Sequence, residues 1–128
     1  MEKTVLVVDD SLFIYDEIKY MLEDTNYRIV GYAKDGAQAM RMYEKLKPDV
    51  VTMDIIMPGI NGLDTSKLLL DRWHDAKIVI VSSLAYDETR EESEKAGVSG
   101  FIFKPLEKME FIEALNQATG QDSASSRK

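Results

Sequence analysis

The stretch that decides the fold is VLVVDD, residues 5–10, in which a run of aliphatic side chains ends in two carboxylates. The same arrangement recurs in VVTMD at 50–54, and in FIFKP at 101–105 the polar residue is a lysine. Short runs rich in β-branched and aliphatic residues are typical of strands buried on both faces. In an open parallel sheet, the carboxyl ends of the strands lie at the edge where ligands bind. We therefore expect three carboxylates and one ammonium group to meet at that edge.

The charged residues at these strand ends are Asp9, Asp10, Asp54 and Lys104. Charges of one sign are costly to gather in a partly buried place unless they are paired or bind a counter-ion. Carboxylate oxygens are the ligands that a hard cation such as Mg²⁺ prefers, and an ammonium group complements a phosphoryl group. The set therefore predicts a site for a hard cation together with a phosphoryl group.

The composition bounds the class of protein. The chain has 128 residues, which is enough for one domain with its own core, and it has no cysteine, which excludes thiol chemistry and disulfides. A net charge of -7 opposes direct binding to nucleic acid or to an anionic membrane, because both select basic surfaces. No apolar run reaches the length of a secretory core or a membrane span, so we expect a cytoplasmic protein.

Strand-like and helix-like segments alternate along the chain. A first helix follows Ser11, a good N-cap residue, and its pattern ends near residues 24–26. The later segments that the pattern predicts are a strand over 27–33, a helix from Asp35-Gly36 to Lys47, a strand over 50–53, a helix over 63–73, a strand over 77–81, a helix over 86–96, a strand over 101–103 and a last helix from about 107.

Five βα units with short connections require right-handed crossovers, which place all strands in one parallel sheet with helices on both faces. The predicted fold class is therefore α/β, a flavodoxin-like doubly wound (βα)5 sandwich with strand order 2-1-3-4-5. Its switch point lies between the first and third strands. We expect one domain over residues 1–120, followed by a small, polar and disordered tail over 121–128.

The last two helices differ in their apolar patterns. The helix over 86–96 has almost no apolar face, so we expect it to be mobile or to face a partner, although a charged stretch is most simply a solvated surface. In the last helix, Met109, Ile112 and Leu115 stand at the spacing of a core-facing stripe. The single histidine, His74, is expected on the surface.

In order and spacing, these motifs resemble the receiver domain of two-component response regulators, of the chemotaxis response regulator (CheY) type. The matching elements are VVDDS at 7–11, DVVTMDIIMPGING at 49–62, Ser82-Ser83 and FKP at 103–105. The resemblance covers about residues 3 to 119.

The resemblance implies that Asp54 is the phosphoacceptor and takes its phosphoryl group from a phosphohistidine of a sensor histidine kinase. It implies that Asp10 and Asp54 bind Mg²⁺ directly, with the backbone carbonyl of Ile56, and that Asp9 does so through water. Lys104 would pair with the phosphoryl oxygens. The protein would be a signalling switch that catalyses its own phosphorylation and slow dephosphorylation.

The resemblance also implies a switch. The Ser82 hydroxyl would move toward the phosphoryl group, and Phe101 would turn inward, although an aromatic residue on the fifth strand can equally belong to the core. A downstream protein would then read the face formed by the fourth helix, the fifth strand and the last helix, and a phosphatase is a possible further partner. The residues that flank the site are Ser83, Leu84, Met57 and Pro58. Ile56 and Leu84 are apolar at variable positions, so we expect slow hydrolysis.

Other functions remain open at this point. The chain could be the receiver portion of a longer DNA-binding transcriptional regulator, with the tail as the start of a linker. A haloacid dehalogenase-like hydrolase also uses a strand-end aspartate with Mg²⁺, but it needs its two acids two residues apart, whereas Asp9 and Asp10 are adjacent. A flavodoxin-like flavin binder needs a hydroxyl-rich and glycine-rich phosphate loop, and two carboxylates would repel the flavin phosphate.

Overall fold

The computed structural model describes residues 1–84 and 87–121. Across these residues, strands and helices alternate in the predicted order. The elements are β1 (Lys3–Val8), α1 (Leu12–Leu22), β2 (Tyr27–Ala33), α2 (Gly36–Leu46), β3 (Val50–Met53), α3 (Gly62–Arg72), β4 (Ile78–Ser82), α4 (Asp87–Ala96), β5 (Gly100–Phe103) and α5 (Lys108–Thr119).

The strands form one parallel sheet in the order β2-β1-β3-β4-β5, which confirms the predicted fold class. In the pairing of β1 with β3, Val8 lies opposite Met53. The next residues along these two strands are Asp9 and Asp54, so the register alone brings two carboxylates side by side at the switch point.

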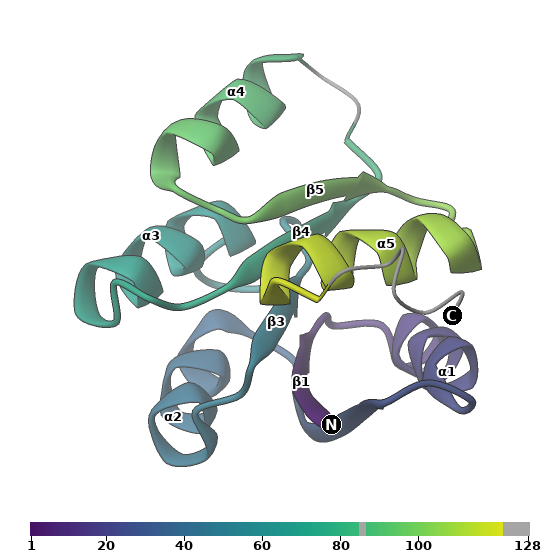
Figure 1. Ribbon diagram of the computed structural model, residues 1–128. Coiled ribbons are helices and arrows are strands. Elements are labelled where there is room, and N and C mark those ends of the chain that lie inside the picture. The colour runs from purple at the N-terminus through teal and green to yellow at the C-terminus, as the bar shows by residue number, and fades with distance from the viewer. Residues whose placement is uncertain (85–86, 122–128) are drawn as a thin grey trace.

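Helices cover both faces of the sheet (Figure 1). On one face, α1 and α5 pack against alternate strand residues such as Val5 and Val50. On the other face, α2 and α3 pack against Leu6 and Val51. The strands are apolar on both sides because each face meets a helical layer, as expected for a parallel sheet. Figure 1 also shows α4 beside β5, at the end of the sheet farthest from β1.

Short polar residues set the helix starts. Ser11, Asp35 and Asn61 each accept a hydrogen bond from a backbone N–H of the first turn of the helix that they precede. Glu107 does the same for α5, so the last helix begins one residue later than its predicted start. Similarly, α3 begins and ends one residue earlier than predicted, and β4 extends to Ser82. Differences of one residue at an element end are ordinary.

The predicted core stripe of the last helix is wrong at one position. Met109 is 69% exposed, and the buried apolar residues of α5 are Phe111, Leu115 and Ala118. Ile112 packs partly against the core. Apolar residues at helical spacing include either Met109 or Phe111, so the spacing alone does not show which of the two faces the core. The orientation of α5 on the sheet decides this and buries Phe111.

The prediction for the fourth helix agrees with the structure where it is described. The predicted start at Tyr86 lies outside the described residues, and so does the predicted tail over 121–128 apart from its first residue. That residue, Gln121, donates hydrogen bonds to Tyr27 and Asn116. In α4 itself, the one buried side chain is that of Ser93.

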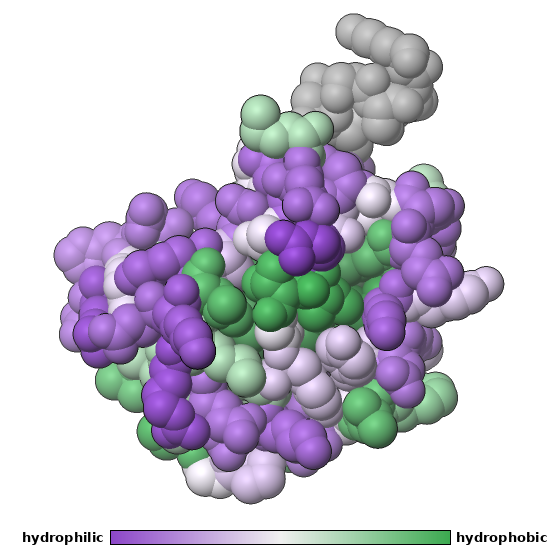
Figure 2. Space-filling model, turned by 90° about the horizontal axis from the view of Figure 1, so that it is seen from below, coloured by the Kyte–Doolittle hydropathy of each residue, from purple (hydrophilic) through white to green (hydrophobic). Residues whose placement is uncertain are grey.

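Figure 2 shows the molecule from below, where charged and polar side chains surround a central apolar area and further apolar areas lie nearer the rim. This is the side on which α1 and α2 lie in Figure 1. Throughout residues 1–84 and 87–121, we find no helix with both the length and the apolar character that crossing a membrane requires.

Candidate functional site

The acidic site is built on the ends of β1 and β3. The Asp9 N–H donates to the Ala33 carbonyl (3.0 Å), and the Asp54 N–H donates to the Val8 carbonyl (2.9 Å), so both residues continue the hydrogen bonding of the sheet. One carboxylate oxygen from each of Asp9, Asp10 and Asp54 lies within 4.8 Å of the others. Asp9 and Asp54 are buried and Asp10 is exposed, so the cluster opens to solvent on the side of Asp10.

Lys104 joins this cluster from the position directly after β5, a strand that lies two positions away from β3 in the sheet. Its Nζ lies 3.1 Å from Oδ2 of Asp9 and 3.5 Å from Oδ1 of Asp54. The backbone holds the residue in place, because the Lys104 N–H donates to the Ser82 carbonyl (2.8 Å). The structure therefore brings together the four charged residues that the sequence singles out at its strand ends.

The cluster is electrostatically unbalanced. Burial, and then the charge of Asp9, raise the pKa of Asp54 to about 6, while Lys104 lowers it and only partly offsets these effects. Three carboxylates around one ammonium leave an excess of negative charge that a divalent cation would balance. Oxygen ligands of this kind fit Mg²⁺, which binds proteins through one or two carboxylates and keeps several waters.

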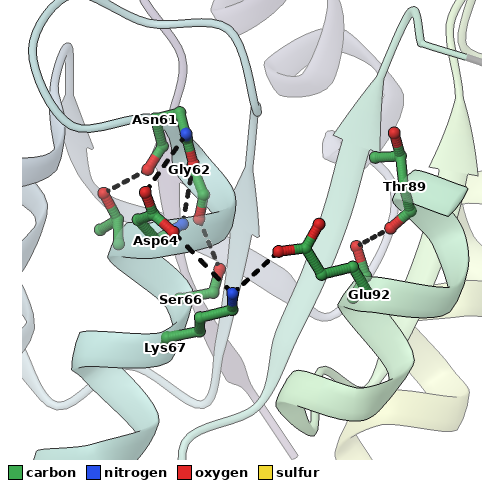
Figure 3. Close-up of polar contacts among 9 residues, drawn as sticks. Asn61, Gly62, Asp64, Ser66, Lys67, Thr89 and Glu92 are labelled. Atoms are coloured by element: carbon green, nitrogen blue, oxygen red, sulfur yellow. Dashed lines mark hydrogen bonds and ion pairs between the residues drawn. The ribbon is translucent and has the colours of Figure 1, made fainter.

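The loop after Asp54 is hydrogen-bonded to the start of α3, where Figure 3 shows Asn61, Gly62 and Asp64. The Gly62 N–H donates to the Ile55 carbonyl (2.7 Å), and Asn61 caps the helix by accepting from the Asp64 N–H (2.8 Å). A Cβ at Gly62 would overlap the carbonyl oxygen of Asp54. Glycine is therefore required because α3 approaches the phosphoacceptor candidate more closely than any side chain would permit.

The residues beside the cluster differ in exposure. Met57 is buried, Pro58 and Ser83 are exposed, and Leu84 is partly buried. Ile56 is 56% exposed. The Ser82 side chain is completely buried, and its Oγ accepts a hydrogen bond from the Leu84 N–H (2.9 Å).

Phe101 lies on the outermost strand of the sheet. It is partly buried against the core on the side of α2 and α3, and its ring meets the ring of Phe103 edge-on, with the centroids 5.2 Å apart. The Arg90 guanidinium of α4 lies 6.0 Å from the Phe101 ring centroid. Phe101 thus contacts both the core and the helix beside β5.

Sequence reasoning missed two hydroxyl groups near this site, those of Tyr32 and Thr52. Both are enclosed by the protein and have no hydrogen-bond partner among residues 1–84 and 87–121. Tyr32 and Thr52 pair with Val7 from opposite sides, two residues before Asp9. No sequence motif marks these two hydroxyl groups. Knowledge of the strand register would have been needed to place both residues beside Val7, two residues before Asp9.

Comparison with known proteins agrees with this geometry. The family model of the response regulator receiver domain matches residues 5–116. The chain is 39% identical to the chemotaxis protein CheY of Thermotoga maritima over 119 residues, which cover 93% of this chain and 99% of the relative.

Two solved structures have the same architecture. The response regulator domain of Thermotoga maritima CheB has a TM-score of 0.87 and 34% identity, covering 95% of this chain and 99% of that one. In the CheX-CheY-BeF3-Mg complex from Borrelia burgdorferi, the matched chain has a TM-score of 0.86 and 26% identity, covering 89% of this chain and 87% of that one. Strand order, acidic cluster and similarity all point the same way, and the chain belongs to the response regulator receiver domain family as a CheY-like member.

Proposed function

We propose that this protein accepts a phosphoryl group on Asp54 from a phosphohistidine of a sensor histidine kinase, in a reaction that depends on Mg²⁺. The observation that carries the proposal is the position of Asp54, a buried strand-end carboxylate with two acidic neighbours and with the Lys104 ammonium 3.5 Å away. A nucleophile, a set of cation ligands and a fixed positive charge are the parts that phosphoryl transfer requires.

In the transfer, an Asp54 carboxylate oxygen forms the new bond to phosphorus as the bond from phosphorus to the histidine nitrogen breaks. The pair of electrons stays on the imidazole. A bound Mg²⁺ would supply charge neutralisation for an anionic donor meeting an anionic acceptor. With a pKa of about 6, Asp54 is mostly ionised at neutral pH and able to attack. Lys104 lies where its ammonium group can pair with the oxygens of the incoming phosphoryl group.

The contacts of Asp9 indicate which residues would bind the cation directly and which would contact it through water. Its Oδ1 accepts from the Ser11 N–H (2.9 Å) and its Oδ2 from Lys104 (3.1 Å), so both oxygens are already engaged. Asp10 is exposed, and its carboxylate is open to solvent. We therefore assign Asp10, Asp54 and the Ile56 carbonyl to direct coordination and Asp9 to contact through water.

The proposed switch couples Asp54 to the α4-β5-α5 face. The Ser82 oxygen is an acceptor toward Leu84, which leaves its hydroxyl proton free to be donated to a phosphoryl oxygen. Movement of Ser82 would then draw the following residues, Ser83 and Leu84, inward and let Phe101 turn. Between α4 and α5, a groove of about 300 Å³ lies over β5 and is lined by residues that include Arg90, Glu94 and Phe101. We propose this face as the binding surface for a downstream protein.

Phosphorylation in vitro tests the assignment of Asp54. With acetyl phosphate and Mg²⁺, intact-mass spectrometry should show one added phosphoryl group on the wild type and none on Asp54→Asn. The matched control is Asp71→Asn, which makes the same chemical change at an exposed position of α3 and should be phosphorylated like the wild type. Normal labelling of Asp54→Asn would contradict the proposal.

The lifetime of the aspartyl phosphate is a second test. Hydrolysis needs a water in line with the scissile bond, and neither Ile56 nor Leu84 can hold such a water by a hydrogen bond. We expect slow decay after removal of the donor, and faster decay in the double variant Ile56→Asn with Leu84→Glu. Equal decay of the two proteins would refute the water-placement argument and leave the assignment of Asp54 intact. A dedicated phosphatase would be the natural partner of a slowly decaying phosphate.

A further inference from the structure

The hydroxyl group of Tyr32 is enclosed by the protein and lacks a hydrogen-bond partner among the described residues, a property it shares with the Thr52 hydroxyl. A desolvated hydroxyl without a partner is unfavourable, and most buried polar groups avoid that state. The position of the group in the sheet suggests what it serves. Tyr32 pairs with Val7 of β1, and Asp9 follows Val7 by two residues, directly after the end of that strand and on the same face.

The Tyr32 ring is held in a defined orientation. It stacks on the ring of Tyr15 in α1, with the centroids 4.5 Å apart and an angle of 24° between the planes. Tyr15 lies in the first turn of α1, a few residues after Asp9 and Asp10. Its N–H donates to the carbonyl of Ser11, the N-cap of the helix (3.2 Å). The stack therefore ties the end of β2 to the segment that carries Asp9 and Asp10.

The charges that act on the Tyr32 hydroxyl include two carboxylates of the acidic site, Asp9 and Asp10. Burial comes first among the causes that raise the pKa of Tyr32, and the carboxylates of Asp9, Asp10 and Asp16 follow. The group therefore stays neutral at physiological pH, with one proton to donate and lone pairs to accept. None of these carboxylates is within hydrogen-bond distance, so a bridging species is needed to connect them.

We propose that Tyr32 is a positioning residue of the acidic site, whose hydroxyl hydrogen-bonds to the water shell of the cation held by Asp9, Asp10 and Asp54. The inference rests on the proposed function, because it requires a bound cation. Mg²⁺ keeps several waters when it binds a protein, and those waters are strong hydrogen-bond donors that need acceptors. The Tyr32 oxygen can accept a hydrogen bond from such a water.

The variant Tyr32→Phe tests this proposal because it removes the hydroxyl and keeps the ring and its stacking on Tyr15. Titration calorimetry with Mg²⁺ alone should show a dissociation constant raised about three- to tenfold, as expected for the loss of one hydrogen bond. The metal-free variant should unfold at the same urea concentration as the wild type or a higher one, because an unpartnered hydroxyl has been removed. These opposite signs separate a positioning role from a purely structural one.

Two control variants make the test specific. Tyr20→Phe makes the same chemical change on α1 at a side chain that is 75% exposed, and it should leave Mg²⁺ binding unchanged. Thr52→Val removes the other enclosed hydroxyl without changing the volume much, and it should also keep the wild-type dissociation constant. If Tyr32→Phe binds Mg²⁺ as tightly as the wild type, or if Thr52→Val weakens binding equally, the proposal is wrong.

The outcome also separates this proposal from the proposed function. A wild type that binds Mg²⁺ and is phosphorylated on Asp54, together with a Tyr32→Phe variant of unchanged affinity, overturns only the role of Tyr32. A wild type that binds no Mg²⁺ overturns both. In an Asp10→Asn background, the effect of Tyr32→Phe should shrink, because the cation whose waters it contacts is already held more weakly.

Discussion

Two neighbouring helices of similar length, α3 and α4, are attached to this protein in different ways. Five residues of α3 are buried, namely Gly62, Leu63, Thr65, Ser66 and Leu69, and its first residue is hydrogen-bonded to the loop that follows Asp54. In α4, the one buried side chain is Ser93. An ion pair links the two helices, between Lys67 Nζ and Glu92 Oε2 at 2.9 Å, and both side chains are substantially exposed (Figure 3).

The difference teaches where this protein is rigid and where it can respond. Burial of apolar side chains supplies most of the free energy that holds a helix in place, whereas an exposed ion pair supplies little. The helix α3 is therefore firmly packed, and it holds the loop after Asp54 in a fixed position. The helix α4 can shift or open locally at low cost, which is what the proposed switch at the α4-β5-α5 face requires. Four predictions test this contrast.

The largest expected effect comes from Gly62→Ala in α3. Alanine normally stabilises a helix relative to glycine, but here its Cβ would overlap the Asp54 carbonyl oxygen. We expect the free energy of unfolding, measured with urea, to fall by about 3 kcal/mol, as for overpacking in a rigid core. In the control Gly100→Ala, the added Cβ would lie 3.6 Å from Val79, an ordinary contact, and a much smaller change should follow. Equal effects would show that α3 is not tightly seated.

Removal of the Asp54 charge should have the next largest effect, and it should depend on pH. The folded protein raises the pKa of Asp54 to about 6, so it binds this proton more tightly than the unfolded chain does. The protonated form thus contributes stability that is present near pH 4 and is lost as the pH rises through 6.

At pH 8 without Mg²⁺, Asp54→Asn should therefore be more stable than the wild type by about 2 kcal/mol. This is less than the full value of the shift, because the site is open to solvent beside Asp10. The difference should vanish near pH 4, and added Mg²⁺ should reduce it by stabilising the wild type. A variant less stable than the wild type at pH 8 would mean that Asp54 contributes mainly favourable hydrogen bonds.

A matched pair of serines compares the two helices directly. Ser66 in α3 and Ser93 in α4 are both completely buried, and each donates to the carbonyl four residues earlier at 2.8 Å. Loss of the Ser93 hydroxyl in Ser93→Ala should cost about 1 kcal/mol. Hydrogen exchange should then be about fivefold faster in α4, with α3 unchanged.

In Ser66→Ala, by contrast, we expect exchange in α3 to change only together with that of the β3 core. This outcome would show that α3 opens only by global unfolding. If Ser93→Ala alters exchange throughout the sheet, α4 is not an independent unit and the contrast between the helices fails.

The smallest effect is expected from the ion pair that joins the helices. Glu92→Gln should speed hydrogen exchange in α4 by about twofold or less at low salt, because exposed ion pairs contribute little. At high salt, the variant and the wild type should agree, since exposed charges are screened. Arg72→Gln, which breaks the exposed pair of Arg72 with Glu44, is a control that should leave α4 unchanged. A large increase in exchange that persists at high salt would show that the Lys67–Glu92 ion pair contributes substantially to holding α4 in place.

Much of the fold and the charged residues of the site could be predicted from local sequence patterns. Buried parallel strands leave uninterrupted apolar runs, and helix caps leave short polar residues such as Ser11 and Asp35 at their proper places. Because the carboxyl ends of parallel strands share one edge, the order of the elements was enough to bring Asp9, Asp10, Asp54 and Lys104 together.

Contacts between distant segments could not be predicted in this way. The sequence showed an apolar period in the last helix but did not show that α5 turns Phe111 to the core and Met109 to solvent. It placed Gly62 just before the predicted helix over 63–73, and it did not show the close approach to the Asp54 carbonyl that requires glycine there.

The sequence by itself determined the order of the strands and helices, the strand-end charges and the family motif, because each of these depends on residues that are close in the chain. Only the tertiary structure decided which atoms meet. It placed the Lys104 ammonium between Asp9 and Asp54, left the Tyr32 hydroxyl enclosed beside the acidic site, and attached α4 through few buried contacts. Such features follow from the packing of segments that are far apart in the chain, and local pattern carries no record of how side chains from those segments fit together.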